Sequence, residues 1–473
     1  MSLHGEAHEH SLLAEVIRGE LLKKLSNKAR ILLPFDEDKR DFDKANLRFT
    51  QYERPTYLAV VEPSCEQDVI NAVNYAREKG IPFTPRGGHH AVTSTMRHFQ
   101  NGLCINMRPL NQMRWDSEYQ QITVGGGTLT DEFVHFAHDL GMEVSIIGVS
   151  FGAGLGRLQG KYGFLNDNMV SCKLVLADGS VLIASKDSHA DLFWAIRGAG
   201  HNFGIALEAT FQVYPQAHGG IHHTWDLEYT LDQCDEVFDT LNSVHETMPA
   251  ELAIFVLWMR QSSGRKHVIL VNLVWSGPVA DASPYIQRFE SLRPVLNSGC
   301  TSVPWPELPF CTYKEINKLY CKPEVWLRGP LKIMGAACVE KFDLRTTREF
   351  FESVKVMSEE WEDRGWFGAM FECLPDQRAL ISDIRMLNAT PKRIEDRAIF
   401  ENHLDHWKQR FVETSGYGRL QQYVNYGNTT SSLQDSLEAL YGYEPWRLEK
   451  LRLLKQKYDP DNMFRWYQPI VQP

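Results

Sequence analysis

The sequence predicts an α+β fold with two lobes. The chain has 473 residues, more than one hydrophobic core usually holds, and 43% of them are apolar, enough to bury two cores. Between residue 58 and about residue 215, short apolar runs alternate with glycine turns and amphipathic stretches, in the order strand, turn, helix. From about residue 219, strands and helical stretches at 231–247, 345–361 and 393–412 predict an antiparallel sheet covered by helices.

Composition argues against several classes of function. The formal net charge is -10 with both signs interspersed, whereas a nucleic-acid partner needs a basic face. The longest apolar run, 252–259, is far shorter than the roughly 20 residues that span a bilayer, so no membrane segment is expected. The first thirty residues lack the pattern of a secretion signal, and the nine cysteines form no CxxC pair. We therefore expect a cytoplasmic protein, with mostly free thiols and no metal site.

Residues 1–50 predict a helical lead-in. Apolar residues recur there at helical spacing, at Leu12, Leu13, Val16, Ile17, Leu21 and Leu22. A strand at 58–61 and a helix that ends at Gly80 follow, and a strand at 81–84 leads into a glycine loop.

That loop reads Arg86-Gly87-Gly88-His89-His90. Two adjacent glycines can aim successive backbone N–H groups into one concavity, which suits the oxygens of a pyrophosphate, and Arg86 could add a charge-assisted contact. The histidines supply an imidazole from which a flavin ring can be tethered. Taken alone, the same run also fits an ordinary surface turn.

Further glycine motifs favour a cofactor site. A strand at 121–124 runs into Gly125-Gly126-Gly127, followed by a helix that ends at Gly141. The stretch 148–163 interleaves glycines with Leu, Phe and Tyr, which would be wasted in a disordered linker but suit a tight backbone path against a ligand. A strand at 173–177 and a short helix at 191–197 resume the alternation.

The order of these motifs resembles the berberine bridge enzyme-like flavoproteins, of the vanillyl alcohol oxidase type, and in particular their fungal secondary-metabolism branch. The motifs are Arg-Gly-Gly-x-His, Gly-Gly-Gly-Thr, Gly-Arg-Leu-Gln-Gly-x-Tyr-Gly, Ala-Asp-Gly and Asp-Leu-Phe-Trp-Ala-x-Arg-Gly-Ala-Gly-His-Asn-Phe-Gly-Ile. The resemblance covers residues 55–215 and returns in 423–426 and 441–460. It implies a PCMH-type FAD-binding lobe of two subdomains plus a substrate lobe. The corresponding boundaries are 1–50 for the lead-in, 51–216 for the FAD-binding domain, 217–420 for the substrate domain and 421–473 for a C-terminal segment returning to the FAD lobe.

The resemblance also implies which residues contact FAD. They are Arg86, Gly87, Gly88, His89, His90, Thr93, Gly125, Gly126, Gly127, Thr128, Gly148, Val149, Ser150, Gly152, Gly154, Gly156, Tyr162, Gly163, Asn168, Gly204, Ile205, Tyr423 and Asn425. The glycine loop and the triple glycine would hold the pyrophosphate, and Gly204-Ile205 would lie near the adenine.

Relatives attach the flavin 8α-methyl to the histidine of an Arg-x-Gly-Gly-His pattern. Counting from Arg86 places this tether at His90, with His89 where the family has glycine; aligning on Gly-Gly-His places it at His89 instead. His90 is preferred because residues 93–96 then also fit the fungal pattern. Some relatives form a second bond through a cysteine, but the corresponding segment 141–148 contains none.

The run Tyr423-Val424-Asn425-Tyr426 is predicted to be a strand, with Tyr423 and Asn425 on one face. The resemblance implies that Tyr426 lies near the flavin and acts as catalytic base, although a packing role is equally open. Because a phenol has a pKa near 10, Tyr426 would need a nearby cation or flavin-linked hydrogen bonding. Glu372 and His201 are the alternative bases.

These features predict an FAD-dependent oxidoreductase that removes a hydride and a proton from a small, largely apolar metabolite. Molecular oxygen is the expected electron acceptor, and the protein is expected to be a monomer or a dimer. Aromatic residues across 305–371 suit an apolar pocket. A redox-neutral isomerase or cyclase on the same scaffold, and a non-catalytic binding protein, are the alternatives.

Overall fold

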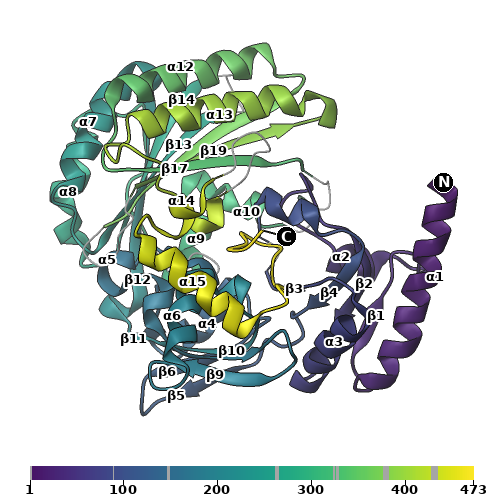
Figure 1. Ribbon diagram of the computed structural model, residues 1–473. Coiled ribbons are helices and arrows are strands. Elements are labelled where there is room, and N and C mark those ends of the chain that lie inside the picture. Colours follow the sequence, from purple (N-terminus) through teal and green to yellow (C-terminus); the bar gives the residue numbers. More distant parts are fainter. Residues whose placement is uncertain are drawn as a thin grey trace.

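The computed structural model describes residues 3–88, 90–145, 150–260, 266–322, 325, 330–375, 383–427 and 435–472. Two small sheets form a first lobe, and one large sheet forms a second lobe (Figure 1). The C-terminal segment, yellow in the figure, returns to the middle of the molecule between them. The predicted α+β class is confirmed.

The first subdomain is a four-stranded sheet in the order β1-β2-β4-β3. Its strands are β1 Arg30–Leu32, β2 Tyr57–Glu62, β3 Phe83–Arg86 and β4 Gly102–Asn106. Helix α3 (Glu66–Lys79) packs on it through an apolar face, and Gly80 ends the helix at φ +64°, a conformation that favours glycine. The strand predicted at 81–84 begins and ends two residues later, so that Arg86 is its last residue.

The lead-in is only partly helical, which corrects the prediction for residues 1–50. Helix α1 (Leu3–Leu21) contains all of the periodic residues except Leu22, which begins a short 3-10 helix, and only Ile17 and Leu21 of the set are buried against the first subdomain. β1 then pairs antiparallel with β2, and α2 (Arg40–Ala45) follows. The extra strand was missed because it is three residues long, too short to show a period.

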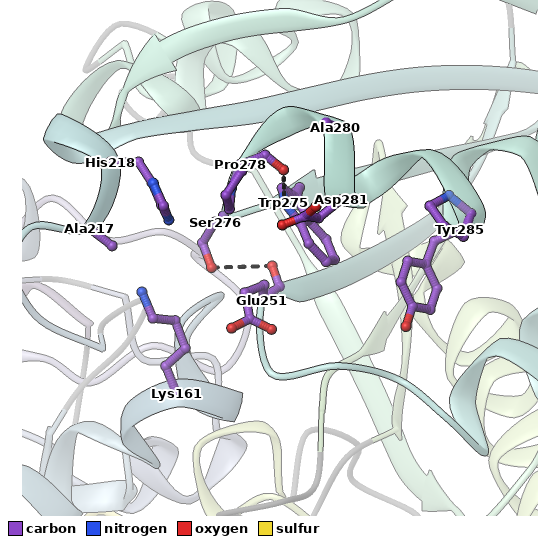
Figure 2. Close-up of a pocket in the computed structure, with 12 residues that line it drawn as sticks. Lys161, Ala217, His218, Glu251, Trp275, Ser276, Pro278, Ala280, Asp281 and Tyr285 are labelled. Carbon is purple, nitrogen blue, oxygen red and sulfur yellow. Dashed lines mark hydrogen bonds between the residues drawn. The ribbon is translucent and has the colours of Figure 1, made fainter.

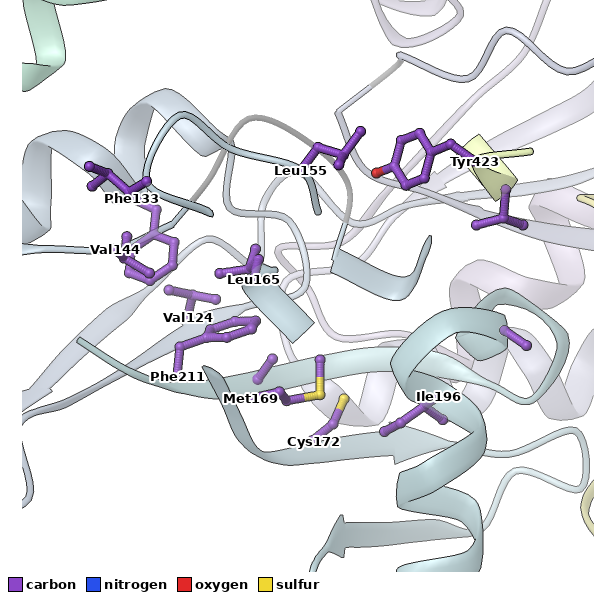
Figure 3. Close-up of a cluster of buried hydrophobic side chains, with 14 of the residues drawn as sticks. Val124, Phe133, Val144, Leu155, Leu165, Met169, Cys172, Ile196, Phe211 and Tyr423 are labelled. Carbon is purple, nitrogen blue, oxygen red and sulfur yellow. The ribbon is translucent and has the colours of Figure 1, made fainter. Parts of the chain in front are cut away.

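The second subdomain is a five-stranded sheet in the order β5-β6-β10-β8-β9. Its strands are β5 Met113–Asp116, β6 Gln121–Gly125, β8 Met169–Val175, β9 Val181–Ser185 and β10 Ile205–Gln212. Helices α4 (Thr130–Asp139) and α6 (Ala190–Ala199) contribute Phe133 and Ile196 to its core. Figure 3 shows this core, with Tyr423 from the C-terminal segment at its edge. β7 (Met142–Glu143) pairs with β11 (Tyr214–Pro215) beside it.

The second lobe is an eight-stranded antiparallel sheet. Its strands are β12 Ile221–Thr230, β13 Leu252–Arg260, β14 His267–Trp275, β15 Leu296–Asn297, β16 Thr301–Pro304, β17 Ile333–Val339, β18 Gly365–Cys373 and β19 Asp383–Pro391. The covering helices α7 (Cys234–His245), α12 (Leu344–Glu360) and α13 (Arg397–Glu413) confirm the three predicted stretches. The sequence pattern also predicts a hairpin with its turn at Ser262-Ser263-Gly264, between β13 and β14, but this turn lies outside the described residues.

The two faces of the large sheet have different neighbours. Ile254, Val256 and Phe371 pack with the three covering helices. Phe255, one residue further along β13, joins the core of the first lobe instead, and its register partner Glu372 points to the same side. The strand period therefore places a glutamate on the face that looks toward the first lobe. Shorter helices complete the chain: α5 Gln159–Tyr162, α8 Ser283–Glu290, α9 Leu308–Cys311 and α10 Asn317–Tyr320.

The C-terminal helices α14 (Leu437–Tyr441) and α15 (Pro445–Tyr458) dock on the first lobe. Lys455 of α15 is 2% exposed and its Nζ lies 2.6 Å from Asp459. The same Nζ donates to the carbonyls of Asn202 and Phe464. This buried and fully hydrogen-bonded ion pair indicates that Lys455 and Asp459 have a structural role in the C-terminal segment.

Replacing Lys455 with Met should destabilise the fold by about 3–5 kcal/mol, because it leaves the buried Asp459 carboxylate without its partner. Chemical denaturation of the holoprotein measures this change. Lys457→Met is the matched control, since Lys457 pairs with Asp191 on the surface and its loss should change stability little. Equal effects from the two variants would contradict the structural role.

Within the described ranges, no helix combines the length and the apolar character needed to cross a membrane. All nine cysteines are free thiols.

Candidate functional site

The glycine loop follows directly from the end of β3. Within the described residues, the backbone N–H groups of Gly87 and Gly88 donate to no protein acceptor. Arg86 is buried, and its Nη2 donates to the carbonyl of Leu47 at 2.5 Å, so its guanidinium anchors the loop to the lead-in. The two N–H groups are therefore available to an oxygen-rich ligand, while Arg86 has a protein contact of its own.

The triple glycine has a different role. The N–H groups of Gly125, Gly126 and Gly127 donate to the carbonyls of Gln112, Leu207 and Leu110, so they are not free to bind a phosphate. A Cβ on Gly126 would lie 1.9 Å from the carbonyl oxygen of Ala206. These glycines allow backbones to approach closely, and they bring Thr128 near the loop.

Orphan polar atoms mark the predicted cofactor region. Buried side-chain polar groups are normally hydrogen bonded, yet Thr128 Oγ1, Ser145 Oγ and both amide atoms of Asn166 have no partner in the described structure. They come from turns next to the glycine motifs. A cofactor rich in oxygen and nitrogen would satisfy them, so the residues present fit FAD.

The glycine stretch packs against the returning C-terminal segment. Its first turn, the 3-10 helix Ser150–Gly152, contacts Asn425 so closely that a Cβ on Gly152 would lie 2.1 Å from Asn425 Oδ1. Two residues on, the N–H of Gly154 donates to Tyr423 Oη at 3.3 Å. The structure thus brings Gly152 and Gly154 together with Tyr423 and Asn425, although the two pairs lie about 270 positions apart in sequence.

The remaining predicted contacts are placed in the surrounding framework. Tyr162 stacks on Tyr214 with ring centres 4.0 Å apart, and Asn168 Nδ2 donates to the carbonyl of Tyr162 at 3.0 Å. The carbonyl of Gly156 accepts a hydrogen bond from the N–H of Gln159, and Thr93 Oγ1 accepts one from the N–H of Thr95. Gly163 has a left-handed conformation, with φ +75°. Gly204 packs closely against the carbonyl of Val175, and Ile205 is the first residue of β10. His89, Gly148 and Val149 lie outside the described residues.

His90 carries the preferred tether position. Its ring stacks on Phe49, with ring centres 4.4 Å apart and planes 19° from parallel. Desolvation by the surrounding protein, together with the nearby charge of Lys332, lowers the pKa of His90 to about 4. The imidazole is therefore neutral at pH 7, which leaves a nitrogen lone pair available for bond formation.

Residues 424–426 form a 3-10 helix, which corrects the predicted strand at 423–426. The cause is local, because the N–H of Tyr426 donates to the carbonyl of Tyr423 at 2.9 Å and closes a turn. The turn directs the two tyrosine rings at right angles, with centres 4.9 Å apart. Tyr426 Oη then reaches β18 and donates to Glu372 Oε1 at 3.1 Å.

Glu372 is a buried carboxyl group with a perturbed pKa. Burial raises the pKa of Glu372 to about 7, against the opposing effects of the Tyr426 hydrogen bond and the Arg157 charge. Its second oxygen, Oε2, has no hydrogen-bond partner in the described structure. The pKa of Tyr426 is raised well above its usual value by burial and by the Glu372 carboxylate. Two of the three predicted bases thus form one pair, and Glu372 is the better proton acceptor.

Arg157 and Tyr313 border this pair, although the sequence did not identify either of them as a site residue. Arg157 Nη2 donates to Tyr313 Oη at 2.8 Å, and the guanidinium lies 5.0 Å from the centre of the Phe255 ring. Tyr313 begins three consecutive left-handed residues, held by Asp226 through the N–H groups of Tyr313 and Lys314. Arg157 occurs within the glycine stretch, but Asp226 and Tyr313 carry no motif that could have identified them.

His201, the third predicted base, lies elsewhere. Its Nε2 is 3.0 Å from Tyr441 Oη, and its ring packs edge-on against Tyr467. Burial lowers the pKa of His201 to about 3, so the ring is neutral and too weakly basic to accept a proton at pH 7. These contacts give His201 a role in docking the C-terminal segment.

A pocket of about 620 Å³ opens on another part of the surface (Figure 2). Lys161, His218, Glu251 and Asp281 line it together with Trp275 and Tyr285. None of the predicted site residues lines this pocket, so it is separate from the Tyr426–Glu372 pair.

A glycine loop with unbonded N–H groups, buried polar atoms without partners beside it and a buried tyrosine–carboxyl pair facing it define a flavin-binding class of enzyme. Family models match in two places: an FAD binding domain over residues 57–185 and a "Berberine and berberine like" segment over residues 422–471. The chain belongs to the berberine bridge enzyme-like FAD-linked oxidoreductases, and its cofactor is FAD.

Individual relatives agree with this assignment. The FAD-linked oxidoreductase alt4 of Alternaria solani is 78% identical, over 98% of both chains. The FAD-linked oxidoreductase anuG of Penicillium roqueforti is 30% identical, over 96% of this chain and 91% of the relative. Among solved structures, the Physcomitrella patens BBE-like 1 protein superposes with a TM-score of 0.81 at 19% identity, over 97% of this chain and 99% of that one. The last similarity concerns the fold.

Proposed function

We propose that this protein oxidises a small, largely apolar metabolite, with Glu372 as the catalytic base and molecular oxygen as the final electron acceptor. FAD, when bound, supplies the hydride acceptor. The observation that supports the proposal is the Tyr426–Glu372 pair, which lies on the sheet face that looks toward the FAD lobe.

The Tyr426–Glu372 pair would accept the proton that leaves the substrate. When a C–H bond gives up a hydride, the O–H or N–H on the same carbon must lose a proton. Glu372 Oε2, which has no protein partner in the described structure, is positioned to accept it. Tyr426 donates to Oε1 and so stabilises the ionised carboxylate. The fungal FAD-linked oxidoreductases to which the chain is related also support an oxidation.

Cofactor retention is the second part of the proposal. Gly87, Gly88 and Thr128 would bind FAD oxygens, and the neutral His90 ring would carry the covalent tie. We propose in addition that the protein is cytoplasmic, that it is a monomer or a dimer, and that it binds no nucleic acid.

The direct test is anaerobic mixing of the yellow holoprotein with candidate apolar alcohols and amines. Oxidation predicts bleaching of the flavin absorbance and a product lighter by two hydrogen atoms. Product formation without bleaching would instead identify a redox-neutral reaction.

Tyr426→Phe should shift the pH dependence of flavin reduction. Removing the hydroxyl takes away a hydrogen bond that lowers the pKa of Glu372, so the pH at which the rate is half-maximal should rise above about 7. Stopped-flow reduction between pH 5 and pH 9 measures it. A lost rate at every pH with an unchanged midpoint would indicate that Tyr426 itself is the base.

A further inference from the structure

Lys332 is a buried cation close to the proposed flavin tether. Its side chain is 8% exposed, and its Nζ lies 3.4 Å from the centre of the Phe49 ring. The Phe49 ring in turn stacks on His90. Lys332 therefore lies one aromatic ring away from His90.

Backbone hydrogen bonds hold the lysine in this position. Thr50 Oγ1 donates to the carbonyl of Lys332 at 2.8 Å, and the N–H of Gln51 donates to the carbonyl of Pro330 at 2.8 Å. These bonds tie the residues before β17 to the lead-in, far away in sequence. The placement of Lys332 is thus a property of the folded framework.

No protein anion balances this charge in the part of the chain that the structure describes. Lys332 takes part in no ion pair there, and its Nζ faces the rings of Phe49 and Tyr320. Lysines are rarely buried without a partner, because removing an ammonium group from water is costly. An anionic oxygen from a ligand would restore the missing partner through a charge-assisted hydrogen bond.

An apolar wall continues from the lysine to the catalytic pair. Lys332 directly precedes β17, and Met334 of that strand belongs to the same apolar cluster as Phe49, the ring that Lys332 faces. The wall consists of Val92, Met334 and Met386, with Phe49, Met370 and Tyr426 packed against them. Thioether side chains adapt to irregular apolar shapes, and the wall ends at the tyrosine that contacts Glu372.

We propose that Lys332 binds a carboxylate of the substrate, which makes the substrate an apolar carboxylic acid. Its carboxylate pairs with Lys332 Nζ, and its apolar body lies along the methionine wall with the oxidised carbon near Glu372. This inference rests on the proposed function for the position of that carbon, whereas the anion site stands on the surroundings of Lys332.

The test uses the FAD-loaded protein and two probes of one shape, trans-cinnamate and its neutral analogue trans-cinnamamide. Calorimetric titration at pH 7 should show that the parent binds cinnamate about tenfold or more tightly than cinnamamide. Lys332→Met should remove this preference by weakening only cinnamate binding, while Lys332→Arg should retain it. Lys450→Met is the control, because Lys450 of α15 also lies over an aromatic ring, that of Trp194, and its replacement should leave the preference for cinnamate unchanged.

Three results would overturn the proposal. They are a parent that shows no preference for cinnamate, a Lys332→Met variant that keeps the preference, and a Lys332→Met variant that loses bound flavin. The last result would assign the cation to FAD. Because the probes are scored by binding and not by oxidation, failure here leaves the proposed oxidation standing, and absence of flavin bleaching leaves the anion site standing.

Discussion

Replacing Glu372 with Gln is expected to slow anaerobic flavin reduction by about 10²- to 10⁴-fold while the amount of bound FAD stays the same. Glutamine keeps the shape of the side chain but cannot accept the substrate proton. In the parent, the rate should rise about tenfold per pH unit below pH 7 and level off above it, because burial raises the pKa of Glu372 to about 7 and only the carboxylate is a base. Glu372→Gln should lose this limb of the pH profile.

Glu401→Gln provides the matched control. Glu401 is also buried and also accepts a hydrogen bond from a tyrosine, Tyr52, but it lies on α13, on the helix-covered side of the sheet. Stopped-flow measurements should show nearly parental flavin reduction for this variant. If Glu372→Gln also reduced at the parental rate, the base would have to be another group, with Tyr426 the next candidate.

Replacing His90 with Ala is expected to convert all covalently held flavin into flavin that is released on denaturation. The neutral imidazole of His90 is the proposed bond-forming group, and alanine offers none. Flavin fluorescence on a denaturing gel and the intact mass of the protein measure the result directly. The native variant should still bind FAD, because Gly87, Gly88 and Thr128 are unchanged.

His89→Ala decides the register of the tether. If His90 carries the bond, this variant keeps its flavin mass after denaturation. Loss of the flavin mass in His89→Ala alone would move the tether by one residue. A parent without flavin mass would show that contacts alone hold the cofactor.

Most elements of the fold could be predicted because their signals are local. Gly80 and Gly141 end helices in a left-handed conformation, as their positions after periodic stretches indicate. The three helices that cover the large sheet follow their apolar periodicity closely. In contrast, β17, β18 and β19 were not predicted as strands. β17 is buried at every residue and so lacks the alternation that marks a half-exposed strand.

The candidate site was predicted in parts. The glycine loop and the Tyr423–Tyr426 run could be identified from residue types in order, and the resemblance linked them to FAD. The sequence could not decide whether Tyr426 or Glu372 is the base, because the pKa of each group depends on its burial and on its contact with the other group. The triple glycine was assigned to phosphate binding, but its N–H groups are used inside the fold, a distinction that no count of glycines contains.

The sequence was therefore sufficient for the class of fold and the position of the main loops, because glycine turns and helix periods express local backbone requirements. The cofactor followed from the resemblance of these motifs to a flavoprotein family. The tertiary structure decided which charged side chains share a site. Glu372 contacts Tyr426, which is 54 positions away in sequence, and Lys332 lies over the ring of Phe49, which stacks on His90. Such encounters depend on strand register and on burial, which set both the distances between groups and the free energy of their charged forms.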